Sequence, residues 1–270
     1  MPATALNLIL SNLRITYAAM LIMLRDRWFI MSRGGYIVLW TIRPVFDLAI
    51  AALIHASGRT ELVSYVAIGI TANAFIFTTI FWVGEILDRE RLRGTLPALF
   101  LSPGARLSWL GGFTLAGAAE TVLTAAVVLA AGLVLFGVVL NVAWLSLLVT
   151  GALFLTSLVG MGLIFASAGL LVRQSNGLAN LLSPFVMLFG GIYFPVSDLP
   201  LLLRIVARML PLGYATEALA LSTLDAASLG EISHLLWPLA GFALILPFAG
   251  YLAVRTVDFL MRREGSVDLY

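Results

Sequence analysis

Long apolar segments, separated by short polar ones, dominate the chain. Six of them cover residues 36–56, 62–84, 109–138, 142–172, 178–194 and 234–254, without alternation between polar and apolar positions. A helix needs about 20 apolar residues to cross the hydrocarbon core of a bilayer. Helices also satisfy their backbone hydrogen bonds within the segment, as lipid requires. The pattern therefore predicts an all-α integral membrane protein with six transmembrane helices.

Arginine positions predict how these spans are oriented, because cytoplasmic loops of membrane proteins carry an excess of basic residues. If both termini are cytoplasmic, twelve arginines lie on the cytoplasmic side: Arg14, Arg25, Arg27, Arg33, Arg89, Arg91, Arg93, Arg106, Arg173, Arg255, Arg262 and Arg263. Arg59, Arg204 and Arg208 then lie on the outer side, and Arg43 lies within the first span. We therefore predict a multi-pass protein with both termini in the cytoplasm.

The first 33 residues show a different pattern, an apolar stripe at spacings of three and four residues. Its members are Leu6, Leu10, Leu13, Tyr17, Met20, Leu24 and Trp28. An amphipathic helix lying in the cytoplasmic interface fits this stripe. The alternative is a seventh span, in which a central Arg14 would cost about 2.5–3.5 kcal/mol. Asp26 lies among arginines and disfavours a secretory signal peptide.

The amino-acid composition excludes several classes of protein. The chain is 61% hydrophobic and 11% charged, with a mean hydropathy of +1.04, which excludes a water-soluble globule. It contains neither Lys nor Cys, so it has no phosphate-binding lysine of the P-loop type and no thiolate nucleophile. The net charge of +2 provides no basic surface for nucleic acid. No sequence motif of a metalloprotease or serine hydrolase is present, so we do not expect an enzyme.

The longest predicted cytoplasmic connection, residues 85–103, is basic and carries a short apolar edge. Its first half can continue the second span as a helix until Gly94 ends it. Thr95 can start a second, short helix, whose apolar edge consists of Leu96, Leu99 and Phe100. Such an edge suits docking into the groove of a partner. Equally, the segment could be basic merely to fix the topology.

The order of residues in this segment resembles the membrane subunits of ABC-2-type ABC transporters. In that family the loop after the second span carries a Glu–x–x–x–Gly–Thr–Leu–Glu–x–Leu–x–x–Ser–Pro pattern and forms a coupling helix in a cleft of the ATPase subunit. The matching residues are Glu90, Gly94, Thr95, Leu96, Leu99, Ser102 and Pro103. Pro97 replaces the Glu that the family commonly has there. The resemblance implies that the matching residues, with Arg91 and Arg93, dock the ATPase subunit.

The outer segment between the fifth and sixth spans, residues 195–221, is interrupted by Pro and Gly. We expect a helix over residues 201–209, capped by Ser197 or Asp198. A break at residues 211–213 is then followed by a second helix up to residue 221. Two short helices that dip back from the outer surface and line a pathway are one interpretation. An ordinary interfacial loop is the other.

This outer segment also resembles the same family, in which it forms a re-entrant outer gate. The residues that carry the resemblance are Gly191, Phe194, Pro195, Pro211, Tyr214 and Glu217. The family usually has an Arg after Glu-Ala-Leu, where this chain has Ala220.

Ionisable residues inside predicted spans are costly and therefore candidates for function. Arg43 and Asp47 share a helix face, and either hold two helices together or lie on the pathway. Glu120 either faces the pathway or pairs with an arginine of another helix. Asn73 is of a type that more often forms hydrogen bonds between helices. His55 and His234 have no second set of ligands nearby, so no metal site is expected.

The resemblance covers nearly the whole chain and implies a single ABC-2 transmembrane domain over residues 1–270. It implies a non-catalytic permease subunit of an ATP-driven exporter in the bacterial plasma membrane. The implied partners are two copies of an ABC ATPase, which bind ATP and Mg, a second permease chain, identical or related, and membrane lipid. No cofactor is expected in this chain.

Several functions remain open within this picture. Apolar helices suit a drug, an antibiotic or a lipid-like amphiphile as cargo, whereas polysaccharide and lipid-linked glycan exporters share the six-span plan. A different class is a secondary transporter driven by protons through Glu120 or the Arg43–Asp47 pair. The sequence shows no inverted halves of the kind that many secondary transporters have.

Overall fold

The computed structural model describes residues 5–30, 46, 48–58, 60–92, 94, 106–172, 181 and 184–263. Its helices are α1 (Ala5–Ile30), α3 (Thr60–Leu92), α5 (Arg106–Phe136), α6 (Trp144–Val172), the 3-10 helix η1 (Val196–Asp198), α8 (Leu201–Arg208), α9 (Pro211–Leu224) and α10 (Ser233–Arg263). Further helical residues lie at 48–56 and 184–189. All regular structure in the described ranges is helical, so the predicted all-α class is confirmed there.

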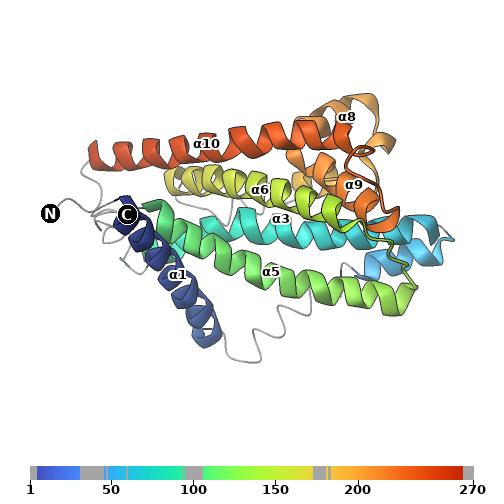
Figure 1. The fold of residues 1–270 in the computed structure, drawn as a ribbon, viewed down its shortest axis with the longest axis horizontal. Helices are drawn as coiled ribbons and strands as arrows, with labels where there is room; N and C mark the ends of the chain where they lie inside the picture. The colour runs from blue at the N-terminus through green and yellow to red at the C-terminus, as the bar shows by residue number, and fades with distance from the viewer. Residues whose placement is uncertain are drawn as a thin grey trace.

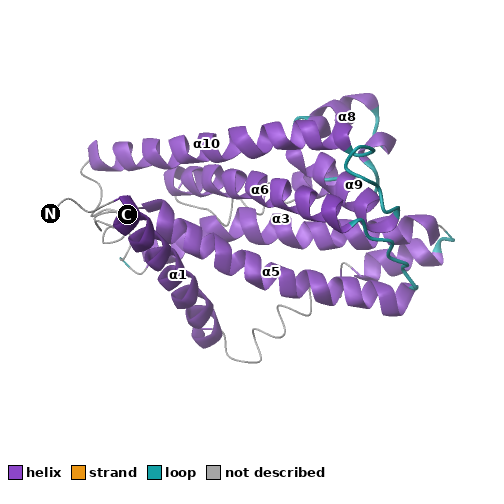
Figure 2. Cartoon of the chain, viewed as in Figure 1, coloured by secondary structure: helices purple, strands orange, loops and turns teal. Residues whose placement is uncertain are grey.

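The long helices α3, α5, α6 and α10 lie along the long axis of the molecule (Figure 1). α10 packs chiefly on α6, and α3 packs on both α5 and α6. α1 crosses the bundle obliquely and contacts α5. The short helices α8 and α9 lie at the end of the bundle where α3 and α10 begin (Figure 1, Figure 2). The last residues of α3, α6 and α10 lie at the opposite end of the bundle (Figure 1).

Two helical stretches among the described residues are long and apolar enough to cross a membrane. They are Trp144–Gly169, with 26 residues, and Ser233–Val257, with 25 residues, and they coincide with the fourth and sixth predicted spans. Shorter apolar stretches, Leu62–Phe77 and Ala125–Phe136, lie within α3 and α5. The first and fifth predicted spans lie partly outside the described residues, so the count of six spans stays a prediction.

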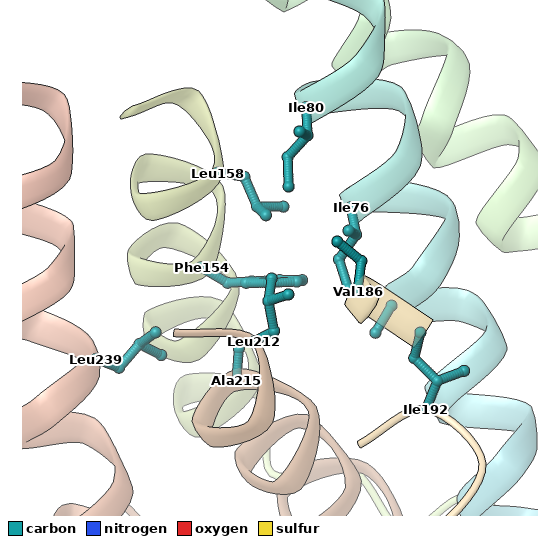
Figure 3. Close-up of a cluster of buried hydrophobic side chains, with 10 residues drawn as sticks. Ile76, Ile80, Phe154, Leu158, Val186, Ile192, Leu212, Ala215 and Leu239 are labelled. Atoms are coloured by element: carbon teal, nitrogen blue, oxygen red, sulfur yellow. The ribbon is translucent and has the colours of Figure 1, made fainter. Parts of the chain in front are cut away.

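Among the described residues, the largest apolar core lies where α3, α6, α9 and residues 184–189 meet, and α10 closes one side of it. Its buried side chains include Ile76, Ile80, Phe154, Leu158, Val186, Ile192, Leu212, Ala215 and Leu239, which point toward a common interior (Figure 3). Phe154 is 2% exposed, so a ring from α6 fills the middle of this core. The short helix α9 therefore shares its core with the long helices.

α1 packs on α5 mainly through residues beside the predicted apolar stripe. Ala19 and Met23 are the buried residues and pack against α5. Leu13 and Tyr17, two members of the predicted stripe, are each 60% exposed. At Gly112 of α5 an added Cβ would lie 2.3 Å from a backbone oxygen of α1. Small residues let the two backbones approach at this point. Met20 and Leu24 of the stripe are partly buried against the same cluster, and the predicted contact of the stripe with the membrane interface stays a prediction.

α6 and α10 cross in direct backbone contact. A Cβ added at Gly160 would lie 2.3 Å from the carbonyl carbon of Leu246, and one at Gly250 would lie 2.8 Å from the oxygen of Gly160. Pro247 lies inside α10 at this crossing, and its backbone nitrogen would lie 2.4 Å from the Cβ added at Gly160. Small residues at both positions let the backbones touch, which is how membrane helices gain packing energy.

Candidate functional site

The outer segment is a compact arrangement of short elements. Residues 184–189 form a helix, residues 190–194 form a turn, and η1, α8 and α9 follow. Pro200 precedes α8, and no side chain caps the first turn of that helix. The predicted cap by Ser197 or Asp198 was therefore wrong; Ser197 Oγ instead donates to Asp198 Oδ1 at 3.2 Å.

The predicted break at residues 211–213 was also wrong. Pro211 is the first residue of α9, a position where its missing N–H costs no helical hydrogen bond. Gly213 follows inside the helix, where an added Cβ would lie 2.7 Å from Val196 Cγ2. The glycine therefore serves close packing between α9 and η1. The two short helices themselves, α8 and α9, lie close to the predicted ranges.

The six residues predicted for the outer gate lie in this compact arrangement. Gly191 is buried with a φ of +64°, a left-handed conformation that glycine adopts without strain. Phe194 packs with the cluster of Phe189, Val196, Leu199 and Ala207. Pro195, Pro211, Tyr214 and Glu217 are buried or half-buried. The structure brings them together around α8 and α9, and their role as a gate stays a prediction.

Arg208, near the end of α8, is held by two residues of α9. Its Nη2 donates to Glu217 Oε2 at 2.8 Å, and the two side chains are 28% and 22% exposed. The guanidinium carbon also lies 4.8 Å from the centre of the Tyr214 ring, within cation–π range. The sequence pattern placed Arg208 on the outer side and indicated neither partner. The ion pair and the ring contact fasten α8 to α9.

We expect a double-mutant cycle on Arg208→Gln and Glu217→Gln to show coupling. Because the pair is partly buried, each single change should lower the stability of the purified protein by about 1 kcal/mol. The double variant should be little worse than Arg208→Gln alone, since that change already removes the ion pair together with the ring contact. Thermal unfolding in detergent measures this. Fully additive losses would show that the two side chains act independently.

The other face of α8 is apolar and uncovered. Its exposed large residues are Leu201, Leu202, Ile205, Val206 and Met209, with Leu202 at 78%. Arg204 bends back so that its Nη2 donates to the oxygen of Leu199 at 3.0 Å. In a membrane protein an exposed apolar helix face of this kind is suited to contact with lipid.

Backbone hydrogen bonds tie the rest of this end to α9. In the connection from α5 to α6, the N–H of Asn141 donates to the oxygen of Thr223 at 2.9 Å. The N–H of Ala143 donates to the oxygen of Ser222, also at 2.9 Å. Before α10, the backbone N–H and the hydroxyl of Ser228 both donate to Glu231, and these bonds lower the pKa of that carboxyl. The end of the bundle that carries α9 is thus a connected unit.

Little of the predicted docking segment falls on described residues. α3 continues as a helix to Leu92, as predicted, so Glu90 and Arg91 lie on its last turn. Gly94 has a φ of +70°, which agrees with its predicted role in ending the helix. Arg93 and the residues Thr95, Leu96, Leu99, Ser102 and Pro103 lie outside the described residues. The docking role therefore stays a prediction.

The ionisable candidates within the spans are only partly described. Arg43 and Asp47 lie outside the described residues, and Glu120 is described only as a backbone position in α5. Asn73 is 1% exposed, and its Oδ1 accepts no hydrogen bond within the described part of the chain, so that oxygen does not join two helices there. Among the described residues no group of three His, Cys, Asp or Glu side chains could hold a metal ion.

Comparison with known proteins identifies the family. The profile of the ABC-2 type transporter family matches residues 18–223, which include all the predicted gate residues and the whole basic connection. No curated protein matches the chain significantly. ABC-2 membrane domains are transmembrane subunits of ABC transporters and work with ATPase subunits. The chain belongs to the ABC-2 type transporter family and is an ABC transporter permease of the membrane.

Proposed function

We propose that the chain is an export permease that forms half of a translocation pathway and is driven by separate ATPase subunits. Two ATPase subunits would bind residues 85–103 of two permease chains from the cytoplasm. The pathway would lie between the two permease chains and would open past residues 195–221. ATP and Mg would be bound by the ATPase, so no covalent chemistry takes place in this chain.

The match of residues 18–223 to the ABC-2 family carries this proposal. The arrangement of the helices is consistent with it, because α3 leads into the basic connection at the end of the bundle opposite to α8 and α9 (Figure 1). In the proposed mechanism, closure of the ATPase pair on ATP moves the connections as levers. The levers bias the bundle between inward-open and outward-open states.

A drug, an antibiotic or another lipid-like amphiphile is the proposed cargo. The apolar surfaces of α5, α6 and α8 favour a molecule that partitions into the membrane, since they offer few charged groups to a soluble solute. A lipid-linked glycan is the alternative within the family. Its polar part would need many hydrogen-bond partners along the path.

Reconstitution tests the proposed dependence on an ATPase. The purified chain alone in proteoliposomes should move no amphiphilic dye against a gradient, with or without a proton gradient. With its ATPase subunits and MgATP it should accumulate the dye. Uphill movement by the chain alone, abolished in Glu120→Gln, would instead identify a proton-driven secondary transporter.

A further inference from the structure

The turn at residues 190–194 is in contact with both a long helix and the outer helices. It follows the helix at 184–189, and Gly190 N still donates to Val186 O at 2.8 Å. Gly191 then turns the chain with its φ of +64°. Ile192 is fully buried in the main core beside α3 (Figure 3). Tyr193 packs against this core and against a second cluster between α3 and α5.

On one side the turn is fastened to α3. The hydroxyl of Tyr65 donates to the oxygen of Gly191 at 2.8 Å, across 126 residues of sequence. One helical turn further along α3, a Cβ added at Gly69 would lie only 1.9 Å from the oxygen of Ile192. The backbone of the turn therefore rests directly on the backbone of α3. A hydrogen bond and a steric contact, one turn apart, fix the turn to this helix.

On the other side the turn is fastened to α9. The hydroxyl of Thr216 lies 2.8 Å from the oxygen of Gly190 and 2.9 Å from the oxygen of Leu212 in its own helix. Thr216 is fully buried. Val196 lies just after the turn, between the turn and α9. A Cβ added at Gly191 would lie 3.0 Å from Val196 Cγ2, and one added at Gly213 would lie 2.7 Å from the same atom. Consecutive carbonyl groups of one turn are thus held by two different helices.

α3 itself is one continuous helix of 33 residues, from Thr60 to Leu92. At about 1.5 Å per residue it is about 50 Å long. The helix contains no proline, one of the causes of sharp kinks, and it is α-helical throughout. Tyr65 and Gly69 lie near the beginning of α3. Its last residues, 85–92, are the first part of the basic connection at residues 85–103. A displacement of the end of α3 at Leu92 would therefore be transmitted along the helix to the turn at residues 190–194.

We propose that the turn at residues 190–194 is the joint through which α3 moves α8 and α9, with Tyr65, Gly69 and Thr216 as its positioning residues. This inference rests on the proposed function, because it assumes that an ATPase moves the end of α3. The ATPase stroke tilts or shifts α3, the fixed turn follows, and Thr216 together with Val196 carries the displacement into α9. The Arg208–Glu217 pair then carries α8 along.

The first experiment needs the chain alone, in lipid nanodiscs, and measures hydrogen exchange of the amides at residues 189–194. Tyr65→Phe removes one hydrogen bond to the turn and should speed exchange about 2- to 10-fold. Tyr251→Phe is the matched control, since Tyr251 lies on the exposed side of α10. Thr216→Val should act like Tyr65→Phe, and Thr216→Ser, which keeps the hydroxyl, should restore slow exchange. Unchanged exchange in both Tyr65→Phe and Thr216→Val would overturn the proposal.

The second experiment uses the complex with the ATPase and follows α8 directly. The chain has no cysteine, so Leu202→Cys, at an exposed position of α8, can carry an environment-sensitive fluorophore. With an otherwise unchanged chain we expect an emission change when ATP is trapped on the ATPase. In Tyr65→Phe the change should weaken about 2- to 10-fold while ATP hydrolysis persists.

The outcomes separate the joint from the proposed function. If Tyr65→Phe gives the full emission change, the turn does not transmit movement and the inference is wrong. If hydrolysis falls in parallel with the emission change, Tyr65 supports the whole bundle and the inference is equally wrong. If no ATPase binds the unchanged chain at all, the proposed function is wrong, and the inference about the joint, which rests on it, is wrong as well.

Discussion

Gly160→Ala should be strongly destabilising, because the added methyl group would lie between the backbones of α6 and α10. The new Cβ would lie 2.3 Å from the carbonyl carbon of Leu246 and 2.4 Å from the nitrogen of Pro247. Both neighbours are backbone atoms of α10, so no side-chain rotation can relieve the contact and the two helices must separate. Overpacking typically costs about 1–3 kcal/mol, and a backbone contact this short belongs at the upper end.

Gly151→Ala on the same helix is the matched control. An added Cβ there has nothing within 4 Å, so the change should be neutral or should raise helix stability by up to about 1 kcal/mol. In thermal unfolding of the purified protein, Gly160→Ala should lower the midpoint by about 6–12 °C, while Gly151→Ala should leave it unchanged or slightly higher. Equal effects of the two changes would contradict the close crossing of α6 and α10.

The helices most easily predicted were those with continuous apolar sequence. The fourth and sixth predicted spans correspond to α6 and α10, because an uninterrupted apolar run of this length has few alternatives to a helix. The predicted continuation of the second span is confirmed to Leu92, and Gly94 has the left-handed backbone that its position suggested. These features depend on local sequence alone.

Contacts between distant segments were not predictable from the same patterns. Tyr65 and Gly191 are far apart in sequence, and neither belongs to a motif that marks the other as its partner. The Arg208–Glu217 pair lies nine residues apart across two helices, so no helical spacing indicates it. Glycines such as Gly69 and Gly112 are ordinary residues in a hydropathy pattern, yet each decides how close two backbones come. The hydrogen bond, the ion pair and the glycine contacts all depend on tertiary packing, which the local sequence pattern does not indicate.

Pro211 shows how a correct local signal can be misinterpreted. Proline and glycine in sequence suggested a break at residues 211–213. Proline is also favoured at the first position of a helix, where its missing N–H is not needed, and that is where α9 begins. The outer gate residues predicted from the family resemblance nevertheless lie together, because the proline and glycine positions fix the two short helices on either side of this point.

The double variant Leu96→Asp, Leu99→Asp should abolish binding of the ATPase subunits. In the proposed function these leucines form the apolar edge of the short helix that enters a groove of the ATPase. A leucine buried at the centre of an interface contributes about 2 kcal/mol or more, and a carboxylate there must also be desolvated. The two changes together should weaken binding at least about 1,000-fold.

Co-purification of the tagged chain with the ATPase measures this loss, and size-exclusion chromatography checks that the variant is folded. Ser266→Asp, Val267→Asp is the matched control, since it adds the same charge to the predicted cytoplasmic end and should retain the ATPase. Because the altered leucines lie outside the predicted spans, the bundle should remain intact and thermal stability should match that of the unchanged chain. Retention of the ATPase by the folded double variant would place the docking surface elsewhere on the chain.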